Sequence, residues 1–193
     1  MLSKSEVTMP IVFGEMVSSV DEIVQAFERH GDRVRGTYRA HYRFDGDSAD
    51  PYVAPRLERP EALRDNPPDV LYPWEAVFMA AAACAGSDYP MFGAHLGIPI
   101  DRVDFVVEGL FDPRGEFDGF SGFRAPVDAR DCYLALHCRA TLASPAPRAA
   151  LARLHELVMS QNMVLNALRG IPRSSELVVI PAATALEMAV VGL

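Results

Sequence analysis

Cys84 is the residue best suited to covalent chemistry, and it lies at the end of a run of small apolar residues. Between Ala76 and Ala85 its thiol is the one polar side chain. Pro73 suits the first turn of a helix, where its missing N–H has no intrahelical partner. A helix that is apolar on every side must be buried in a core or a subunit interface. The pattern therefore leaves two readings of Cys84, a nucleophile in a buried site or a small packing residue.

The surroundings predicted for Cys84 determine what a reaction there would need. A nucleophilic cysteine reacts as the thiolate, which requires a lowered pKa. We expect Pro90 to break or kink the helix, with a second piece from about Tyr89 to Leu96. Cys84 would then lie toward a helix C-terminus, where the helix dipole and burial both disfavour a negative sulfur. An arginine is the best counter-charge, because it stays protonated when desolvated.

Glu75 is the acidic residue on the same predicted helix. It precedes Cys84 by nine positions, which corresponds to opposite sides of a straight helix and about 13 Å along its axis. One helix cannot bring the carboxylate to the thiol, whereas an antiparallel partner helix or a bend can. We therefore expect a working site to require a dimer or a bend in the helix.

The remaining elements form an α+β pattern. A short amphipathic helix over residues 19–30 makes residues 1–32 an N-terminal helical extension, followed by one domain over residues 33–193. Helices on one side of an antiparallel sheet fit the order of the elements. The predicted strands cover residues 33–44, 52–57, 103–110, 132–142 and 177–180, and a long helix opens at Ser144 and closes at Gly170.

These motifs, in this order, resemble the OsmC/organic hydroperoxide resistance family over roughly Arg33 to Ile180. The similar segments are Pro-x-Glu opening an Ala-rich helix that carries a Cys, then Gly-Ile-Pro-Ile at 97–100, Val-Asp-Phe-Val-Val-Glu-Gly at 103–109, and Gln-Asn-Met-Val-Leu-Asn-Ala-Leu at 161–168. The resemblance implies an OsmC-like fold, an intertwined homodimer and active sites at its interface. It also implies reduction of hydroperoxides by the helix Cys, with an Arg and a Glu assisting and a second Cys resolving the sulfenic acid.

Carried over residue by residue, the resemblance is incomplete. Cys84 falls on the peroxidatic position, and Glu75 on a position that some branches of the family use. Trp74 stands where the hydroperoxide-resistance branch has its Glu, and Asn162 stands where the resolving Cys is expected. The assisting arginine comes from the N-terminal strands, with Arg43 the first choice and Arg39 the second.

Two functions from different classes follow. In the first, Cys84 is the single peroxidatic cysteine, Arg43 and Glu75 assist it, Trp74 shapes an apolar pocket, and an external thiol resolves the sulfenate. In the second, the protein is a non-catalytic homodimer whose interface cavity holds an apolar small molecule, with Asn162 as a polar contact. His95 is a candidate for lining the same cavity, and the alternative, a structural histidine with its hydrogen bonds satisfied, is the more common case. Cys138 lies on an apolar strand face and is expected to be core.

Composition excludes several other classes. A net charge of −8 and a pI near 5.1 argue against a nucleic-acid partner. The five histidines show no metal-binding spacing, and no sequence motif indicates a metal or another cofactor. No stretch reads as a signal peptide, and the apolar run is too short to span a bilayer. We expect a cytoplasmic protein with free thiols.

Overall fold

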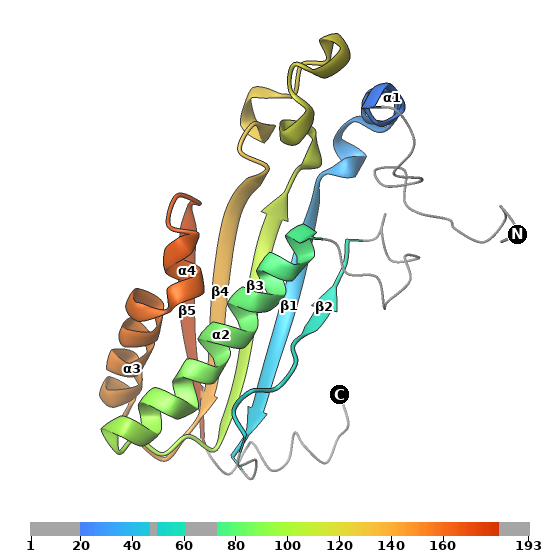
Figure 1. The fold of residues 1–193 in the computed structure, drawn as a ribbon. Coiled ribbons are helices and arrows are strands. Elements are labelled where there is room, and N and C mark those ends of the chain that lie inside the picture. The colour runs from blue at the N-terminus through green and yellow to red at the C-terminus, as the bar shows by residue number, and fades with distance from the viewer. Residues whose placement is uncertain (1–19, 47–49, 61–72, 182–193) are drawn as a thin grey trace, which may run out of the picture.

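The protein folds around a five-stranded sheet with helices on one face (Figure 1). The structure is a computed structural model that describes residues 20–46, 50–60 and 73–181. The strands lie in the order β2-β1-β3-β4-β5. Their bounds are β1 Gly36–Asp45, β2 Arg56–Glu58, β3 Arg102–Phe111, β4 Tyr133–Ala143 and β5 Arg173–Ile180. The helices are α1 Val20–His30, α2 Pro73–Leu96, α3 Arg148–Gln161 and α4 Met163–Ala167. The predicted α+β class is confirmed.

Pairing in the sheet is antiparallel from β2 to β4 and parallel between β4 and β5. The last pairing departs from the wholly antiparallel sheet expected from the sequence. Parallel neighbours need a long crossover connection, and α3 with α4 provides it over the face that α2 also covers (Figure 1). This connection places the end of α3 beside α2.

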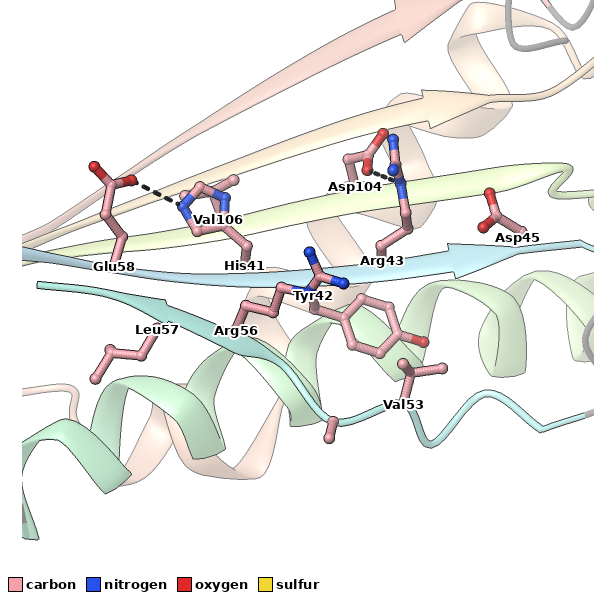
Figure 2. Close-up of a pocket in the computed structure, with 11 residues that line it drawn as sticks. His41, Tyr42, Arg43, Asp45, Val53, Arg56, Leu57, Glu58, Asp104 and Val106 are labelled. Atoms are coloured by element: carbon pink, nitrogen blue, oxygen red, sulfur yellow. Dashed lines mark hydrogen bonds and ion pairs between the residues drawn. The ribbon is translucent and has the colours of Figure 1, made fainter. Parts of the chain in front are cut away.

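Alternation along the strands determines which face is covered. On β1, the side chains of Tyr38, Ala40 and Tyr42 are buried beneath the helices, whereas Arg39 and Arg43 point to the other face. The outer face carries ion pairs instead of a core, among them Arg43 Nε with Asp104 Oδ1 at 2.9 Å (Figure 2). Charged pairs suit a sheet face that stays in contact with water.

α2 runs unbroken for 24 residues and includes Pro90. The predicted break at Pro90 is therefore wrong. Cys84 lies near the middle of α2, where the helix dipole, which acts mainly within the terminal turns, has little effect. Close packing on the sheet stabilises this path: a Cβ on Gly86 would lie 2.1 Å from the Tyr42 ring, and one on Gly109 would lie 1.9 Å from the Phe78 ring.

The predicted long helix from Ser144 is divided in two. Ser144 accepts a hydrogen bond from the Ala146 N–H in the turn before α3, which begins at Arg148. At Asn162 the backbone becomes extended, and the side-chain oxygen of Asn162 caps α4 by accepting from the Leu165 N–H at 2.9 Å. The break turns the Asn162 side chain toward α2.

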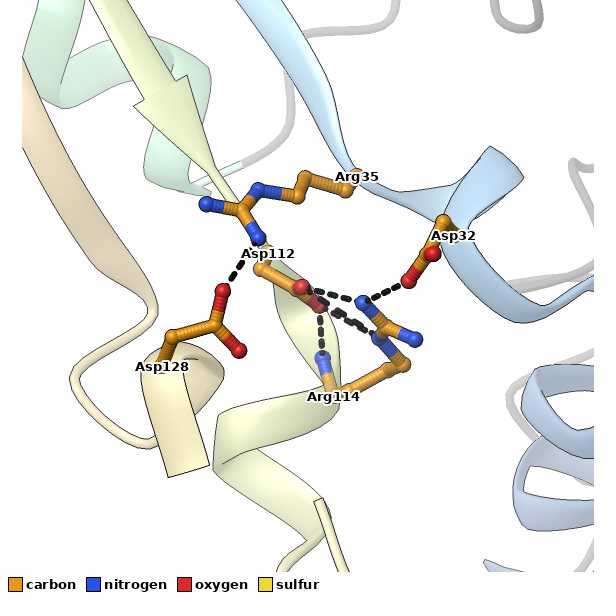
Figure 3. A network of polar contacts seen from close by, with 5 residues as sticks. All are labelled: Asp32, Arg35, Asp112, Arg114 and Asp128. Carbon is orange, nitrogen blue, oxygen red and sulfur yellow. Dashed lines mark hydrogen bonds and ion pairs between the residues drawn. The ribbon is translucent and has the colours of Figure 1, made fainter. Parts of the chain in front are cut away.

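A polar network joins the chain before β1 to the segment after β3 (Figure 3). Arg114 is buried and donates to the buried Asp112 carboxylate and to Asp32, while Arg35 donates to Asp128 at 2.6 Å. Phe27 of α1 packs nearby in a small cluster of its own with Phe117 and Phe123. The N-terminal helix thus contacts the excursion between β3 and β4. No helix in the described part of the chain is long and apolar enough to cross a membrane.

Candidate active site

Cys84 and Asn162 meet where α2 passes the break between α3 and α4. The Nδ2 atom of Asn162 donates to Cys84 Sγ at 3.1 Å. Asn162 is 1% exposed, and Cys84 is half-buried. Because Asn162 Oδ1 already accepts from the Leu165 N–H, the amide is oriented with its NH₂ group toward α2. Two residues 78 positions apart are therefore held in a defined geometry.

Asp88 is the third member of this group. Its Oδ2 accepts from the same Asn162 Nδ2 atom at 2.7 Å, and its side chain lies one helical turn after Cys84 on the same face of α2. Asp88 is only 8% exposed, and burial raises the pKa of its carboxyl, although the hydrogen bond from Asn162 opposes the rise. The sequence analysis missed Asp88, yet its four-residue spacing from Cys84 was a usable signal.

A buried ion pair occupies the other end of α2. Arg59 donates to Glu75 through two nitrogens, with Nε–Oε1 at 2.7 Å and Nη2–Oε2 at 3.0 Å. The Glu75 side chain is fully buried, and that of Arg59 is 9% exposed. Such bidentate pairing holds the guanidinium in a defined plane. Within one chain this pair lies about 13 Å along the helix axis from Cys84.

Arg43 does not pair with Glu75, which corrects the expected arrangement. It lies on the outer face of the sheet with Asp104, beside a pocket of about 680 Å³ (Figure 2). Arg39 also points outward and pairs with Glu108. The alternation of β1 explains both cases, since Tyr42 on the inner face requires Arg43 to face out. Arg59 was missed because it lies between β2 and α2, outside every predicted helix and strand.

Two other predicted residues, Trp74 and His95, lie far from Cys84 along α2. Trp74 is 9% exposed and stacks on Phe111, with ring centroids 5.3 Å apart, about 15 Å along α2 from the thiol. His95 is exposed in the last turn of α2, about 16 Å from Cys84 along the axis. Cys138 is fully buried, which raises the pKa of its thiol to about 11.

The residues beside Asp88 form a second buried polar chain. Tyr89 Oη bonds to His155 Nδ1 at 2.6 Å, and His155 Nε2 lies 3.3 Å from Ser175 Oγ. Burial lowers the pKa of His155, so its ring is held in the neutral form. Among the residues that the structure describes, no group of three or more His, Cys, Asp or Glu could hold a metal ion.

Comparison with known proteins finds similarity in structure and not in sequence. No family model and no curated protein matches the chain. The OsmC-like protein from Mycoplasma pneumoniae has a TM-score of 0.43 and 13% identity, over 72% of this chain and 95% of that one. An OsmC-like hydroperoxide resistance protein from Jannaschia sp. CCS1 has a TM-score of 0.48 and 14% identity, over 70% of this chain and 87% of that one. A hypothetical protein from Aquifex aeolicus VF5 has a TM-score of 0.45 and 10% identity, over 73% of this chain and 95% of that one. Two of these proteins carry the name of the family that the sequence resembles.

Proposed function

We propose that the chain reduces organic hydroperoxides with Cys84 as its single reacting cysteine, and that it works as a homodimer with an external thiol. The observation that carries the proposal is the 3.1 Å contact between Asn162 Nδ2 and Cys84 Sγ. Asn162 occupies the position where the family resemblance implies a resolving cysteine. An amide at that position cannot form a disulfide, but it can hydrogen-bond a thiolate and a sulfenate.

The reaction consists of one oxidation step at Cys84 and two steps in which external thiols react. The Cys84 thiolate attacks the distal peroxide oxygen, so an S–O bond forms, the O–O bond breaks, and the alkoxide takes up a proton and leaves as an alcohol. An external thiol then attacks the sulfenic acid to give a mixed disulfide and water. A second external thiol releases Cys84 and carries the disulfide away.

Activation of Cys84 requires a positive charge, which the proposed dimer would supply. One side of α2 carries small apolar residues that the single chain leaves uncovered: Ala80 is exposed, and Ala76, Val77 and Ala83 are partly exposed. If two copies of α2 crossed antiparallel at Ala80, position 75 of one helix would lie opposite position 85 of the other. The Arg59–Glu75 pair would then lie level with Cys84 of the partner subunit along the helix axes, and a guanidinium that reached the sulfur would favour a thiolate.

The proposal is tested by the rate at which cumene hydroperoxide oxidises Cys84, with dimedone to trap the sulfenate and Cys84→Ser as the blank. We expect oxidation well above the rate of free cysteine, trapped at Cys84. Asn162→Ala should lower the rate about tenfold, the effect of losing one hydrogen bond to a charged group.

The matched control is Asn166→Ala. The Asn166 amide is exposed and donates to the Ser160 carbonyl oxygen, away from the thiol, so the rate should not change. Oxidation of the wild-type protein no faster than that of free cysteine would contradict the peroxidase. Cys84 would then be a packing residue, and the apolar-ligand module would be the function to pursue.

A further inference from the structure

We propose that Asp88 is the acid that protonates the alkoxide leaving from a hydroperoxide attacked by Cys84. This inference rests on the proposed function and adds a catalytic residue to it. It begins from the shared donor: one amide nitrogen of Asn162 bonds both to the sulfur that would attack and to a carboxyl one turn along α2.

The geometry brings the two groups within reach of one peroxide molecule. Distances of 3.1 and 2.7 Å to a common nitrogen place Cys84 Sγ and Asp88 Oδ2 within about 6 Å of each other. A peroxide oxygen in contact with the sulfur leaves its neighbouring oxygen within hydrogen-bond reach of the carboxyl. The Asn162 amide holds both groups in place, because its own oxygen is engaged by the Leu165 N–H.

Burial disfavours the charged form of this carboxyl. Asp88 is nine-tenths buried, and among the described residues no cation forms an ion pair with it. Burial raises the pKa of Asp88. A thiolate bonded to the same amide adds a like charge, and two such groups do not both ionise readily. The proposed reaction uses the singly charged pair in which Asp88 carries the proton and Cys84 carries the charge.

Other titratable groups around Asp88 are already engaged. On α3, His155 bonds to Tyr89. On β5, Arg173 donates to the carbonyl oxygens of Leu165 and Met159. On β4, the Cys138 thiol is buried, with its pKa raised. α4 itself carries no ionisable residue. Asp88 is thus the group beside Cys84 that is placed to exchange a proton with a substrate.

In the step itself, the Cys84 electron pair forms the S–O bond while the O–O bond breaks. The proton of the Asp88 carboxyl moves to the alkoxide oxygen, which gives a sulfenic acid, an alcohol and the Asp88 carboxylate. The sulfenic acid keeps the hydrogen of the hydroperoxide. The carboxylate regains a proton from the second external thiol, whose attack on the mixed disulfide releases Cys84 as the thiolate.

The test compares Asp88→Asn with the wild-type protein in two reactions of Cys84. Cumene hydroperoxide needs a proton for its leaving group, whereas iodoacetamide loses iodide and needs none. We expect Asp88→Asn to slow oxidation by about a hundredfold, the low end of general-acid effects. Alkylation should stay the same or become faster. Ser87→Ala is the matched control, since the Ser87 hydroxyl bonds to the Cys84 carbonyl oxygen and not to Asp88 among the described residues.

The remaining outcomes separate this inference from the proposed function. Unchanged oxidation in Asp88→Asn, with a fast wild-type protein, would overturn the acid role and leave the peroxidase intact. Equal slowing of both reactions would make Asp88 a structural residue and overturn the acid role too. A wild-type rate equal to that of free cysteine would overturn both proposals. Asp88→Glu, which keeps a carboxyl, should recover part of the oxidation rate.

Discussion

At the scale of single residues, burial distinguishes two arginine–carboxylate pairs of the same chemistry. Arg59 and Glu75 lie beneath α2 with almost no exposure, whereas the Arg43 side chain is 48% exposed beside Asp104. Removal of one partner from a buried pair leaves an uncompensated charge away from water, which is costly. An exposed pair contributes little, because water already solvates both groups.

Substitution of the two arginines by methionine should therefore have different effects on stability. We expect Arg59→Met to lower the free energy of unfolding by about 3–5 kcal/mol, because Glu75 loses its buried partner. Arg43→Met should change it by less than about 1 kcal/mol. Urea denaturation followed by circular dichroism measures both values. Equal losses in the two variants would contradict the distinction.

At the scale of elements, α2 depends on glycine where it meets the sheet. Gly86 lies against the Tyr42 ring, which closes the inner face of β1 and donates through its hydroxyl to the Pro51 carbonyl oxygen. A helix gains about 1 kcal/mol when alanine replaces glycine in its interior. Here packing opposes that gain, because the ring occupies the space that a methyl group would need.

We expect Gly86→Ala to destabilise the fold by about 1–3 kcal/mol, the range for overpacking a core. Gly170→Ala is the matched control: nothing lies within 4 Å of a Cβ built there, and the residue is outside every helix and strand. The free energy of unfolding of the Gly170→Ala variant should stay within about 1 kcal/mol of the wild-type value. Thermal unfolding of both variants gives the comparison, and a stabilised Gly86→Ala variant would show that Tyr42 can move aside.

At the scale of the whole molecule, the sheet covers one side of α2 and leaves the other side uncovered. The covered side packs on β1 and β3 and buries Phe78, Ala81 and Ala85. The other side has no charged residue from Ala76 to Ala83, although Ala80 is exposed. A helix apolar all round needs a second covering surface, and the proposed homodimer provides one.

Ala80→Asp should convert the protein from a dimer to a monomer, because two buried carboxylates would face each other at the helix crossing. Sedimentation velocity measures the change, and oxidation of Cys84 by cumene hydroperoxide should fall with it. Ala149→Asp, the same change at an exposed position of α3, should leave both unchanged. An Ala80→Asp protein that remained dimeric would place the interface elsewhere.

Much of the fold could be predicted from local patterns. The alternation along β1, the apolar run of α2 and the turn residues around them reflect interactions between near neighbours in the chain. The same reasoning failed at Pro90 and Asn162. At Pro90, α2 continues unbroken, and its Gly86 packs against Tyr42 of the sheet. At Asn162, the extended backbone divides the predicted helix in two, although the apolar period of the sequence continues through this residue.

The candidate site shows the same division. The sequence by itself determined that Cys84 lies in an apolar helix and that Glu75 faces away from it, and its resemblance to the family placed Asn162 where a thiol is expected. Only the tertiary structure decided that Arg59 and not Arg43 pairs with Glu75, and that Asn162 joins Cys84 to Asp88. The physical reason is that helical and strand periods govern which side of an element a residue occupies, whereas contacts between distant segments depend on how whole elements pack.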